Sequence, residues 1–307
     1  MNAAIRAATR TALAQGVEVV GVRRGYAGLI AGDFQELTAR HVGGILEHGG
    51  TILESARSLE FRTPQGVAHA VSNLEKAGVG GVIVIGGNGS QTGALALSEA
   101  GVPVNGVAST IDNDLAGSDI TIGVDSALSV AVEAIDRLRT TATSHHRLFL
   151  IEVMGRDCGY LALAAGVAGG AEVIITPEEP VAPETVVELV HEAHRRGKKH
   201  AIIVVAEGAH PGIQAFYDTL LADKEACFDP RLTILGHIQR GGRPTAFDRL
   251  LATRLASKAT DLLVRGNTGN LIGFIDGRAE PTPLADIVGK SKPLSQELLD
   301  IAQAMRL

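Results

Sequence analysis

The chain has few of the residues that mark several protein classes. Its 307 residues include no tryptophan, and aromatic residues make up only 3%. So few aromatic rings argue against a surface that stacks on nucleic-acid bases, and the net charge of −6 gives no general attraction to nucleic acid or anionic membranes. No apolar run approaches the roughly 20 residues of a membrane-spanning helix. We therefore expect no nucleic-acid partner and no membrane partner.

Cysteine is also scarce. The two cysteines, Cys158 and Cys227, lie in neither a CxxC pair nor a zinc-ligand spacing. The first 16 residues lack the continuous apolar core of a signal peptide, and their arginines lie within the apolar pattern instead of before it. These features favour a cytoplasmic protein with reduced thiols.

Apolar runs alternate with amphipathic segments along most of the chain, and many of its 37 glycines follow the apolar runs. Continuous apolar strands between helices indicate parallel sheets buried on both faces. The length suits two lobes. The predicted fold class is therefore α/β, with two lobes, each a mostly parallel sheet covered by helices. We expect strands at 17–22, 51–55, 79–87, 102–108, 147–155, 171–178, 200–208 and 231–238. We expect helices at 3–15, 34–48, 64–77, 90–101, 124–142, 159–170, 183–196 and 244–265.

Ligands of such folds bind beyond the carboxyl ends of the strands, so residues just after each predicted strand are candidates. A Gly-Gly-Asn-Gly-Ser turn at 86–90 could bring backbone N–H groups to a phosphate. Two carboxylates, Asp112 and Asp114, follow the next strand. Each feature also has an ordinary structural explanation, a tight turn for the first and an Asx turn for the second.

Three further strand ends carry polar side chains. Arg156 follows Met154-Gly155, Glu207 ends the strand at 200–208, and His237 and Arg240 precede a Gly-Gly pair. Arginine suits the oxyanions of phosphate, although a surface arginine or a core histidine is the ordinary explanation for each position. The whole set together indicates phosphoryl transfer to a sugar.

Four motifs occur in the order and spacing of the 6-phosphofructokinases, which the chain resembles over nearly its whole length. They are GGNGS at 86–90, TIDND at 110–114, MGR at 154–156 and LGHIQRGG at 235–242. The resemblance is to the bacterial ATP-dependent type and implies the phosphofructokinase fold. It implies a nucleotide-binding lobe at 1–123 plus 239–288, and a sugar-phosphate-binding lobe at 124–238 plus 289–307. Lipid and NAD kinases lack the pairing of TIDND with GHIQRGG.

The resemblance also implies residue roles in glycolytic phosphorylation of fructose 6-phosphate at its 1-hydroxyl group. Asp112 is the catalytic base, and the other catalytic residues are Thr110, Arg156, Asp114 and Arg57. The sugar phosphate contacts Arg147, Met154, Gly155, Glu207, Arg231, His237 and Arg240. ATP contacts Arg57, Ser58, Gly87, Asn88, Gly89 and Ser90, with Mg²⁺ at position 88. Because the family supplies the counterparts of Arg147 and Arg231 from a neighbouring subunit, we expect a homotetramer with shared active sites.

An allosteric effector site for ADP or phosphoenolpyruvate is a further implication of the resemblance. Its residues are Arg6, Arg10, Arg139, Glu172, Arg196, Lys198 and His200. The stretch Arg-Arg-Gly-Lys-Lys-His at 195–200 has a simpler explanation as an exposed charged turn before a strand.

Two positions bear on the phosphoryl donor. ATP users of the family carry Gly at position 89, where pyrophosphate users carry Asp; ATP users carry Gly at position 109, where pyrophosphate users carry Lys. Gly89 favours ATP, and Ser109 matches neither type. A pyrophosphate-dependent phosphofructokinase and a non-catalytic sugar-phosphate-binding regulatory homologue remain alternatives.

Two departures from the family pattern predict impaired activity. Position 88 is Asn where the family has a magnesium-linked Asp. The chain also begins at the Met that follows a strand and a glycine loop in the family, so we expect an unpaired strand edge and weaker nucleotide binding. Adding such a segment should raise both the melting temperature and the kinase rate.

Overall fold

The computed structural model describes residues 1–305, which form two compact units. Unit 1 comprises Met1–Thr110, Asp114–Gly123 and Arg243–Lys292. Unit 2 comprises Ile111–Asn113, Val124–Gly242 and the described residues from Pro293 onward. Each unit contains a four-stranded sheet between helices, which confirms the predicted α/β class with helix-covered, mostly parallel sheets.

The sheet of unit 1 has the strand order β10-β9-β4-β3. β3 (Val82–Gly86), β4 (Val104–Ala108) and β9 (Asn270–Ile275) run parallel, and β10 (Arg278–Pro283) returns antiparallel to β9. Every residue of the central strand β4 is buried, whereas β3 lies at the sheet edge and is partly exposed. β3 is therefore an apolar edge strand of the described sheet.

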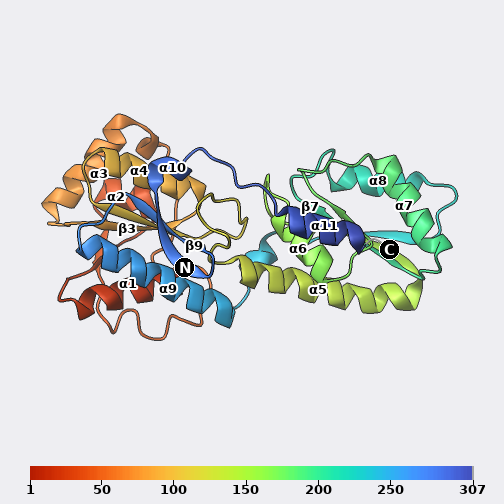
Figure 1. Ribbon diagram of the computed structural model, residues 1–307, viewed down its shortest axis with the longest axis horizontal. Coiled ribbons are helices and arrows are strands. Elements are labelled where there is room, and N and C mark those ends of the chain that lie inside the picture. Colours follow the sequence, from red (N-terminus) through yellow and green to blue (C-terminus); the bar gives the residue numbers. More distant parts are fainter. Residues whose placement is uncertain (306–307) are drawn as a thin grey trace. The chain divides into compact units, whose positions relative to one another are not determined.

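Helices cover both faces of this sheet (Figure 1). α1 (Asn2–Ala14) and α9 (Ala246–Val264) lie side by side on one face, and α3 (Pro64–Lys76) and α4 (Asn88–Glu99) lie on the other. Alanines on the buried faces of α1 and α9 allow the two helices to approach closely. α3 begins at a Thr63 cap followed by proline, which is a favoured start for a helix.

Two predicted elements between residues 34 and 55 are wrong. The expected helix at 34–48 is a short strand, β2 (Phe34–Glu36), followed by turns, because its backbone pairs with β1 (Val20–Val22) and Gly43-Gly44 interrupts any helix. The expected strand at 51–55 is a turn, in which Glu54 has a left-handed φ of 62°. The loop with Arg57 and Ser58 therefore does not follow a strand.

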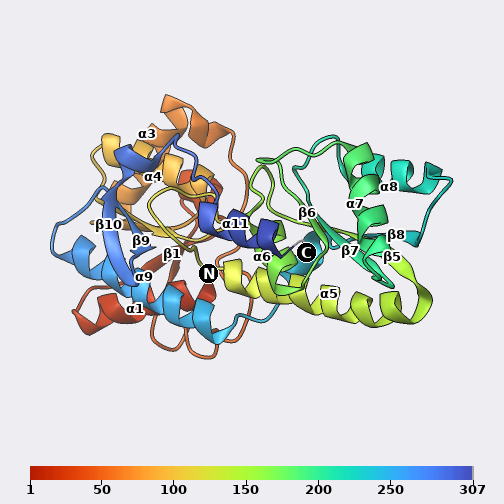
Figure 2. The ribbon, with the colours of Figure 1, turned by 45° about the vertical axis from the view of Figure 1, so that its right-hand side comes forward.

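The sheet of unit 2 is entirely parallel, in the order β6-β7-β5-β8 (Figure 2). Its strands are β5 (Arg147–Val153), β6 (Val173–Ile175), β7 (Ala201–Ala206) and β8 (Asp229–Ile234). All six residues of β7 are buried, as expected for an apolar strand inside a parallel sheet. α5 (Val124–His145) and α6 (Tyr160–Ala168) pack on one face of the sheet, and α8 (Ile213–Ala222) packs on the other beside α7 (Pro183–Arg195).

The strand expected at 231–238 ends early. After Ile234 the chain turns into a 3₁₀ helix, η2 (Gly236–Arg240), so His237 lies on a helical turn. Gly236 has a φ of 51°, a left-handed conformation that ends an extended strand and suits glycine. The sequence analysis also missed several elements: η1 (Glu60–Arg62), α2 (Gly25–Ala31), α8, β9, β10, α10 (Leu284–Ile287) and α11 (Gln296–Ala304).

None of the helices described for residues 1–305 combines the length and the apolar character that crossing a membrane requires.

Candidate active site

The glycine turn of unit 1 joins β3 to the amino end of α4. Gly87 is the N-cap of α4, and its carbonyl accepts the N–H groups of Ser90 and Gln91 at 2.9 and 3.0 Å. A side chain at Gly86 would collide with Ser90, whereas a Cβ atom at Gly89 would meet nothing within 4 Å. The fold thus requires glycine at 86 and leaves open space at 89. An anion there would face the positive end of a 12-residue helix.

Asn88 and Asp114 are hydrogen-bonded at this turn. Nδ2 of Asn88 donates to Oδ2 of Asp114 at 2.8 Å, and to the Asp114 carbonyl at 3.4 Å. The pair offers amide and carboxylate oxygens, the ligand type that Mg²⁺ prefers together with phosphate oxygens and water. No cluster of three or more His, Cys, Asp or Glu side chains suited to a metal occurs among residues 1–305. The donor set therefore fits a cation that is shared with a phosphorylated ligand.

The loop after β4 carries the TIDND motif. Ser109 is 7% exposed, its N–H donates to the Gly86 carbonyl at 3.2 Å, and its hydroxyl donates to the Ile122 carbonyl at 3.4 Å. The Thr110 carbonyl accepts the hydroxyl hydrogen of Thr121 at 2.7 Å. Asp112 and Asn113 are buried, and Asn113 has a left-handed φ of 55°. Tertiary packing thus holds the carboxylate of Asp112 in one defined place.

Arg57 and Ser58 lie in the loop before η1. The hydroxyl of Ser58 accepts the N–H of Phe61 at 3.2 Å, which ties this loop to the 3₁₀ turn. The Arg57 side chain is exposed. Phe61 in turn stacks on Tyr26, whose hydroxyl donates to the Ser90 carbonyl at 2.5 Å. The loop of Arg57 is thereby connected to the glycine turn.

In unit 2 the MGR turn is held by two side chains from neighbouring strand ends. Oε1 of Gln239 accepts the Met154 N–H at 2.8 Å. Oε2 of Glu207 accepts the N–H groups of Gly155 and Arg156, at 3.2 and 3.4 Å. Since β7, β5 and β8 are adjacent, their carboxyl ends bring the three segments together. Glu207 therefore shapes the turn that presents the exposed Arg156 guanidinium.

Two residues near this turn, Gln239 and Glu152, were not among those predicted from the sequence. Gln239 is 2% exposed, and within residues 1–305 its Nε2 has no hydrogen-bond partner. Glu152 is half-buried, and burial, together with the negative charge of Glu207, raises the pKa of its carboxyl group. In the sequence, a single carboxylate near the end of an otherwise apolar strand could have marked Glu152 as a candidate.

His237 and Arg240 are exposed on η2. In a 3₁₀ helix the residues i and i+3 lie one above the other, so both basic side chains project from the same face. Gln239 is buried on another face. The geometry suits two side chains that donate hydrogen bonds to one phosphate.

Arg147 and Arg231 lie elsewhere on this sheet. Both pair with Asp229 at the amino ends of β5 and β8, with Nε of Arg147 at 3.7 Å from the Asp229 carboxylate. The seven residues of β5 separate Arg147 from the MGR turn by about 20 Å. Within a single chain, therefore, these two arginines do not lie beside Glu207 and η2.

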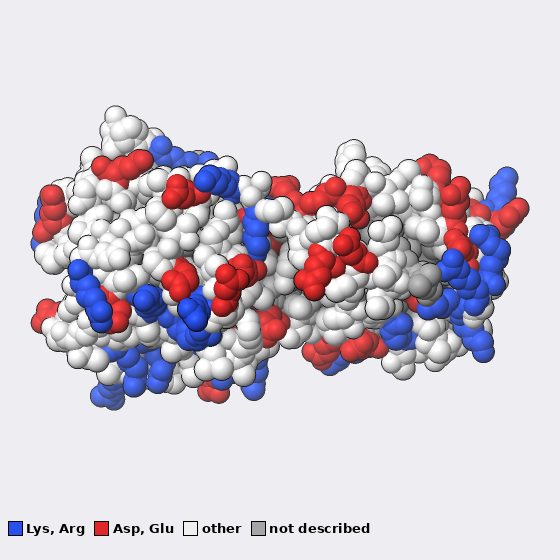
Figure 3. Space-filling view, viewed as in Figure 1, with Lys and Arg blue, Asp and Glu red and all other residues white. Residues whose placement is uncertain are grey.

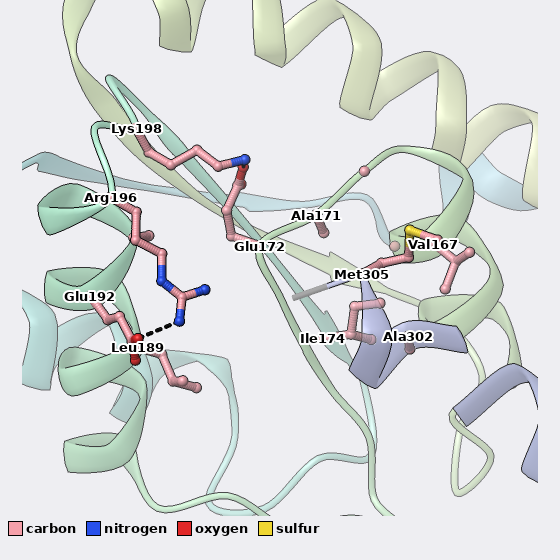
Figure 4. Close-up of a pocket in the computed structure, with 13 residues that line it drawn as sticks. Val167, Ala171, Glu172, Ile174, Leu189, Glu192, Arg196, Lys198, Ala302 and Met305 are labelled. Carbon is pink, nitrogen blue, oxygen red and sulfur yellow. Dashed lines mark hydrogen bonds and ion pairs between the residues drawn. The ribbon is translucent and has the colours of Figure 1, made fainter. Parts of the chain in front are cut away.

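The residues predicted for an effector fall in both units. Arg6 and Arg10 belong to α1 of unit 1, and the other five belong to unit 2. Glu172, Arg196 and Lys198 line a pocket of about 400 Å³, together with residues of α6, α7 and the C-terminal segment. Figure 4 shows Arg196 paired with Glu192 and Lys198 directed at Glu172, whose carboxylate lies 3.4 Å from Nζ of Lys198.

Two more effector candidates lie near this pocket. Arg139 donates to the carbonyls of Gly169 and Gly170. Burial lowers the pKa of His200; the carboxylate of Glu172 opposes this shift, and the charges of Arg139 and Lys198 add to it. In Figure 3, Lys and Arg side chains gather at the end of unit 2 near α7, a face that would attract anions.

Side chains that can bind phosphate and hydroxyl groups, placed at the ends of parallel strands, are typical of kinases that act on small metabolites. The family model described as "Phosphofructokinase" matches residues 1–263, and the chain belongs to the phosphofructokinase family. The ATP-dependent 6-phosphofructokinase 1 of Thermus thermophilus is 53% identical over the whole chain and 95% of its own length. The ATP-dependent 6-phosphofructokinase of Natranaerobius thermophilus is 46% identical with the same coverage.

Solved structures show the same fold. Phosphofructokinase from Saccharomyces cerevisiae superposes on all of this chain and 44% of its own length, with a TM-score of 0.85 and 33% identity. A pyrophosphate-dependent phosphofructokinase from Marinobacter aquaeolei superposes on 99% of this chain and 87% of its own, with a TM-score of 0.85 but 20% identity. The second likeness concerns the fold alone.

Proposed function

We propose that this protein transfers the γ-phosphoryl group of ATP to the 1-hydroxyl group of fructose 6-phosphate, forming fructose 1,6-bisphosphate and ADP. The observation that carries the proposal is the buried Asp112 in a TIDND loop, in a chain 46–53% identical to ATP-dependent 6-phosphofructokinases along its length. In this proposal unit 1 binds the nucleotide and unit 2 binds the sugar phosphate.

In unit 1, the glycine turn and the amino end of α4 bind the phosphates of ATP. Asn88 and Asp114 would hold a divalent metal ion, which we propose to be Mg²⁺, against the phosphate oxygens. When bound, the ion neutralises phosphate charge. The exposed Arg57 contacts the same phosphates, and Thr110 lies beside the 1-hydroxyl group of the sugar.

The transfer itself needs a proton acceptor and positive charge. The carboxylate of Asp112 accepts the proton of the 1-hydroxyl group as the new O–P bond forms. The guanidinium of Arg156 stabilises the charge that spreads over the equatorial oxygens of the phosphoryl group. His237 and Arg240 hold the 6-phosphate, and Glu207 positions the MGR turn and the sugar.

Three observations favour ATP over pyrophosphate. The relatives at 46–53% identity are named as ATP-dependent. Gly89 carries no side chain, and a Cβ atom there would meet nothing within 4 Å, so this position lacks the carboxylate that pyrophosphate users of the family carry. Ser109 uses its hydroxyl to hold the loop, and it does not supply the lysine charge that pyrophosphate users of the family carry at this position.

An assay of the phosphorylated sugar with ATP and then with pyrophosphate as the donor tests the proposal. We expect activity with ATP, and a loss of about 10²–10⁴-fold in kcat for Asp112→Ser because a general base is removed. Activity with pyrophosphate alone would support the pyrophosphate-dependent alternative. Absence of ADP formation, with binding of fructose 6-phosphate retained in Asp112→Ser, would support the regulatory homologue.

We also propose a homotetramer in which Arg147 and Arg231 of one subunit complete the sugar-phosphate site of another. The support is that both lie toward the amino ends of β5 and β8, whereas the MGR turn follows the carboxyl end of β5. Asp112→Ser and Arg231→Ser subunits should each be nearly inactive, and mixing them should restore part of the activity through sites that contain neither substitution. No recovery in mixed oligomers confirmed by mass would contradict shared sites.

For the 400 Å³ pocket we propose an anionic effector, ADP or phosphoenolpyruvate. Lys198, Arg196 and Arg139 supply positive charge, and Glu172 could hold a metal ion bound to the effector. Lys198→Ala should weaken the response of the kinase rate to ADP without changing its kcat. An unchanged response would place effector binding elsewhere.

A further inference from the structure

A cysteine, a histidine and an aspartate of unit 2 form a chain of contacts that the proposed phosphoryl transfer does not use. Sγ of Cys227 lies 3.5 Å from Nδ1 of His191, and Nε2 of His191 lies 2.7 Å from Oδ2 of Asp223. His191 comes from α7, and the other two come from the segment between α8 and β8. The histidine and aspartate side chains are only 20% and 17% exposed, so solvent screens their interaction weakly.

Asp223 determines which nitrogen of His191 carries the hydrogen. Oδ1 of Asp223 accepts the Glu225 N–H at 3.0 Å, and this bond, with the bond to His191, holds the pKa of the aspartate below its usual range. A carboxylate only accepts hydrogen bonds, so Nε2–H of the neutral imidazole donates to it. Nδ1 is then left as a bare acceptor that faces the thiol of Cys227.

The three side chains could act together: Cys227 as a nucleophile, His191 as its base, and Asp223 as the group that orients the base. The thiol proton moves to Nδ1 of His191, and the carboxylate of Asp223 stabilises the imidazolium that forms. The resulting thiolate is the reactive form of cysteine. Cys227 is also partly exposed, whereas Cys158 is buried at 7% exposure.

A metal site fits the same residues less well. A distance of 3.5 Å between sulfur and nitrogen suits two ligands of one tetrahedral ion. Asp223, however, contacts the other nitrogen of the ring, and within residues 1–305 no third ligand completes such a set. Two ligands alone do not make a structural zinc site.

We propose that Cys227 is a modification site for low-molecular-weight disulfides, with His191 as its base and Asp223 as the group that orients the base. The thiolate attacks one sulfur of the small disulfide, a new S–S bond to Cys227 forms, and the original S–S bond breaks. The sulfur of Cys227 is oxidised, and the leaving sulfur is reduced. The leaving thiolate takes the proton from Nδ1 of His191 and departs as a thiol, and excess thiol reverses the exchange.

The test measures the rate of mixed-disulfide formation with oxidised glutathione at pH 7, by intact-protein mass spectrometry of the full chain. In a Cys158→Ser background the only remaining thiol is Cys227. We expect His191→Gln to slow the reaction about tenfold, because the proton acceptor is removed. Asp223→Asn should slow it less, and it also serves as a milder variant if His191→Gln folds poorly.

His194→Gln is the matched control. His194 lies on the same helix but contacts the Phe228 ring edge-on, at 5.4 Å between ring centroids. It should react at the wild-type rate. Equal rates for His191→Gln and the wild type, or an equal slowing by His194→Gln, would overturn the proposal. An acceleration of the wild-type reaction by a metal chelator would show a metal-bound thiol and overturn it as well.

Discussion

Replacing Asn88 with aspartate tests whether the glycine turn needs a cation to hold two neighbouring carboxylates. In the structure Nδ2 of Asn88 donates to Oδ2 of Asp114 at 2.8 Å, so the amide itself partly compensates the carboxylate. Asn88→Asp would replace this hydrogen bond with two facing carboxylates. At about 4 Å between charge centres the repulsion is about 1 kcal/mol in water and about 4 kcal/mol at an effective dielectric constant of 20.

A cation between the two carboxylates would remove this repulsion. We therefore expect Asn88→Asp to lower the free energy of unfolding by about 1–4 kcal/mol without metal, and Mg²⁺ to restore it. Because 1.4 kcal/mol corresponds to tenfold in affinity, a change of about 1 kcal/mol or more should make the variant bind Mg²⁺ at least about fivefold more tightly. The measurements are denaturant unfolding with and without MgCl₂ in the absence of nucleotide, and the kinase rate as a function of free Mg²⁺.

Asn270→Asp is the matched control. Nδ2 of Asn270 donates to Oδ1 of Asn267 and to the Thr268 carbonyl, with no carboxylate as its partner. Its destabilisation should not depend on Mg²⁺. If Asn88→Asp unfolds at the same denaturant concentration with and without Mg²⁺, and its Mg²⁺ dependence of rate matches the wild type, the metal is placed by other groups and the reasoning fails.

Three further predictions concern the two strand-end clusters. Gln239→Leu leaves the Met154 N–H without its acceptor, which costs about 1–3 kcal/mol of stability. We expect kcat/KM for fructose 6-phosphate to fall about tenfold in this variant and to recover partly in Gln239→Glu. An unchanged value would show that Gln239 does not position the MGR turn. Glu152 has a raised pKa in the folded state, so its contribution to stability is fully present below about pH 4.5 and is lost as pH rises through the folded pKa. Glu152→Gln should therefore be more stable than the wild type at pH 7 and lose this advantage near pH 4, as urea unfolding at the two pH values would show; an equal difference at both would contradict the assignment. Gly89→Asp should fold normally, because a Cβ atom there meets nothing, yet lower kcat/KM for ATP by placing negative charge at the helix terminus; unchanged ATP kinetics would remove Gly89 from the donor site.

Much of the fold follows from local patterns in the sequence. The apolar runs at 82–85, 148–151 and 201–206 are strands because parallel sheets bury both faces of such runs. The glycine turn and the MGR turn follow strands as predicted, since glycine after an apolar run marks a strand end. The errors at 34–48 and 51–55 arose where short segments lack a sustained period, and where pairing between β1 and β2 decided the conformation.

The sequence by itself determined the α/β class, most of the parallel strands and the candidate residues at strand ends, because hydrophobic period and glycine position act over a few residues. Tertiary structure alone brought Gln239 and Glu207 onto the backbone of residues 154–156, since adjacent strands in the sheet are distant in the chain. It also placed Arg147 and Arg231 toward the amino ends of β5 and β8, away from that turn, and joined His191 to Asp223 and Cys227. Such contacts depend on how helices pack across a sheet, which no local pattern encodes.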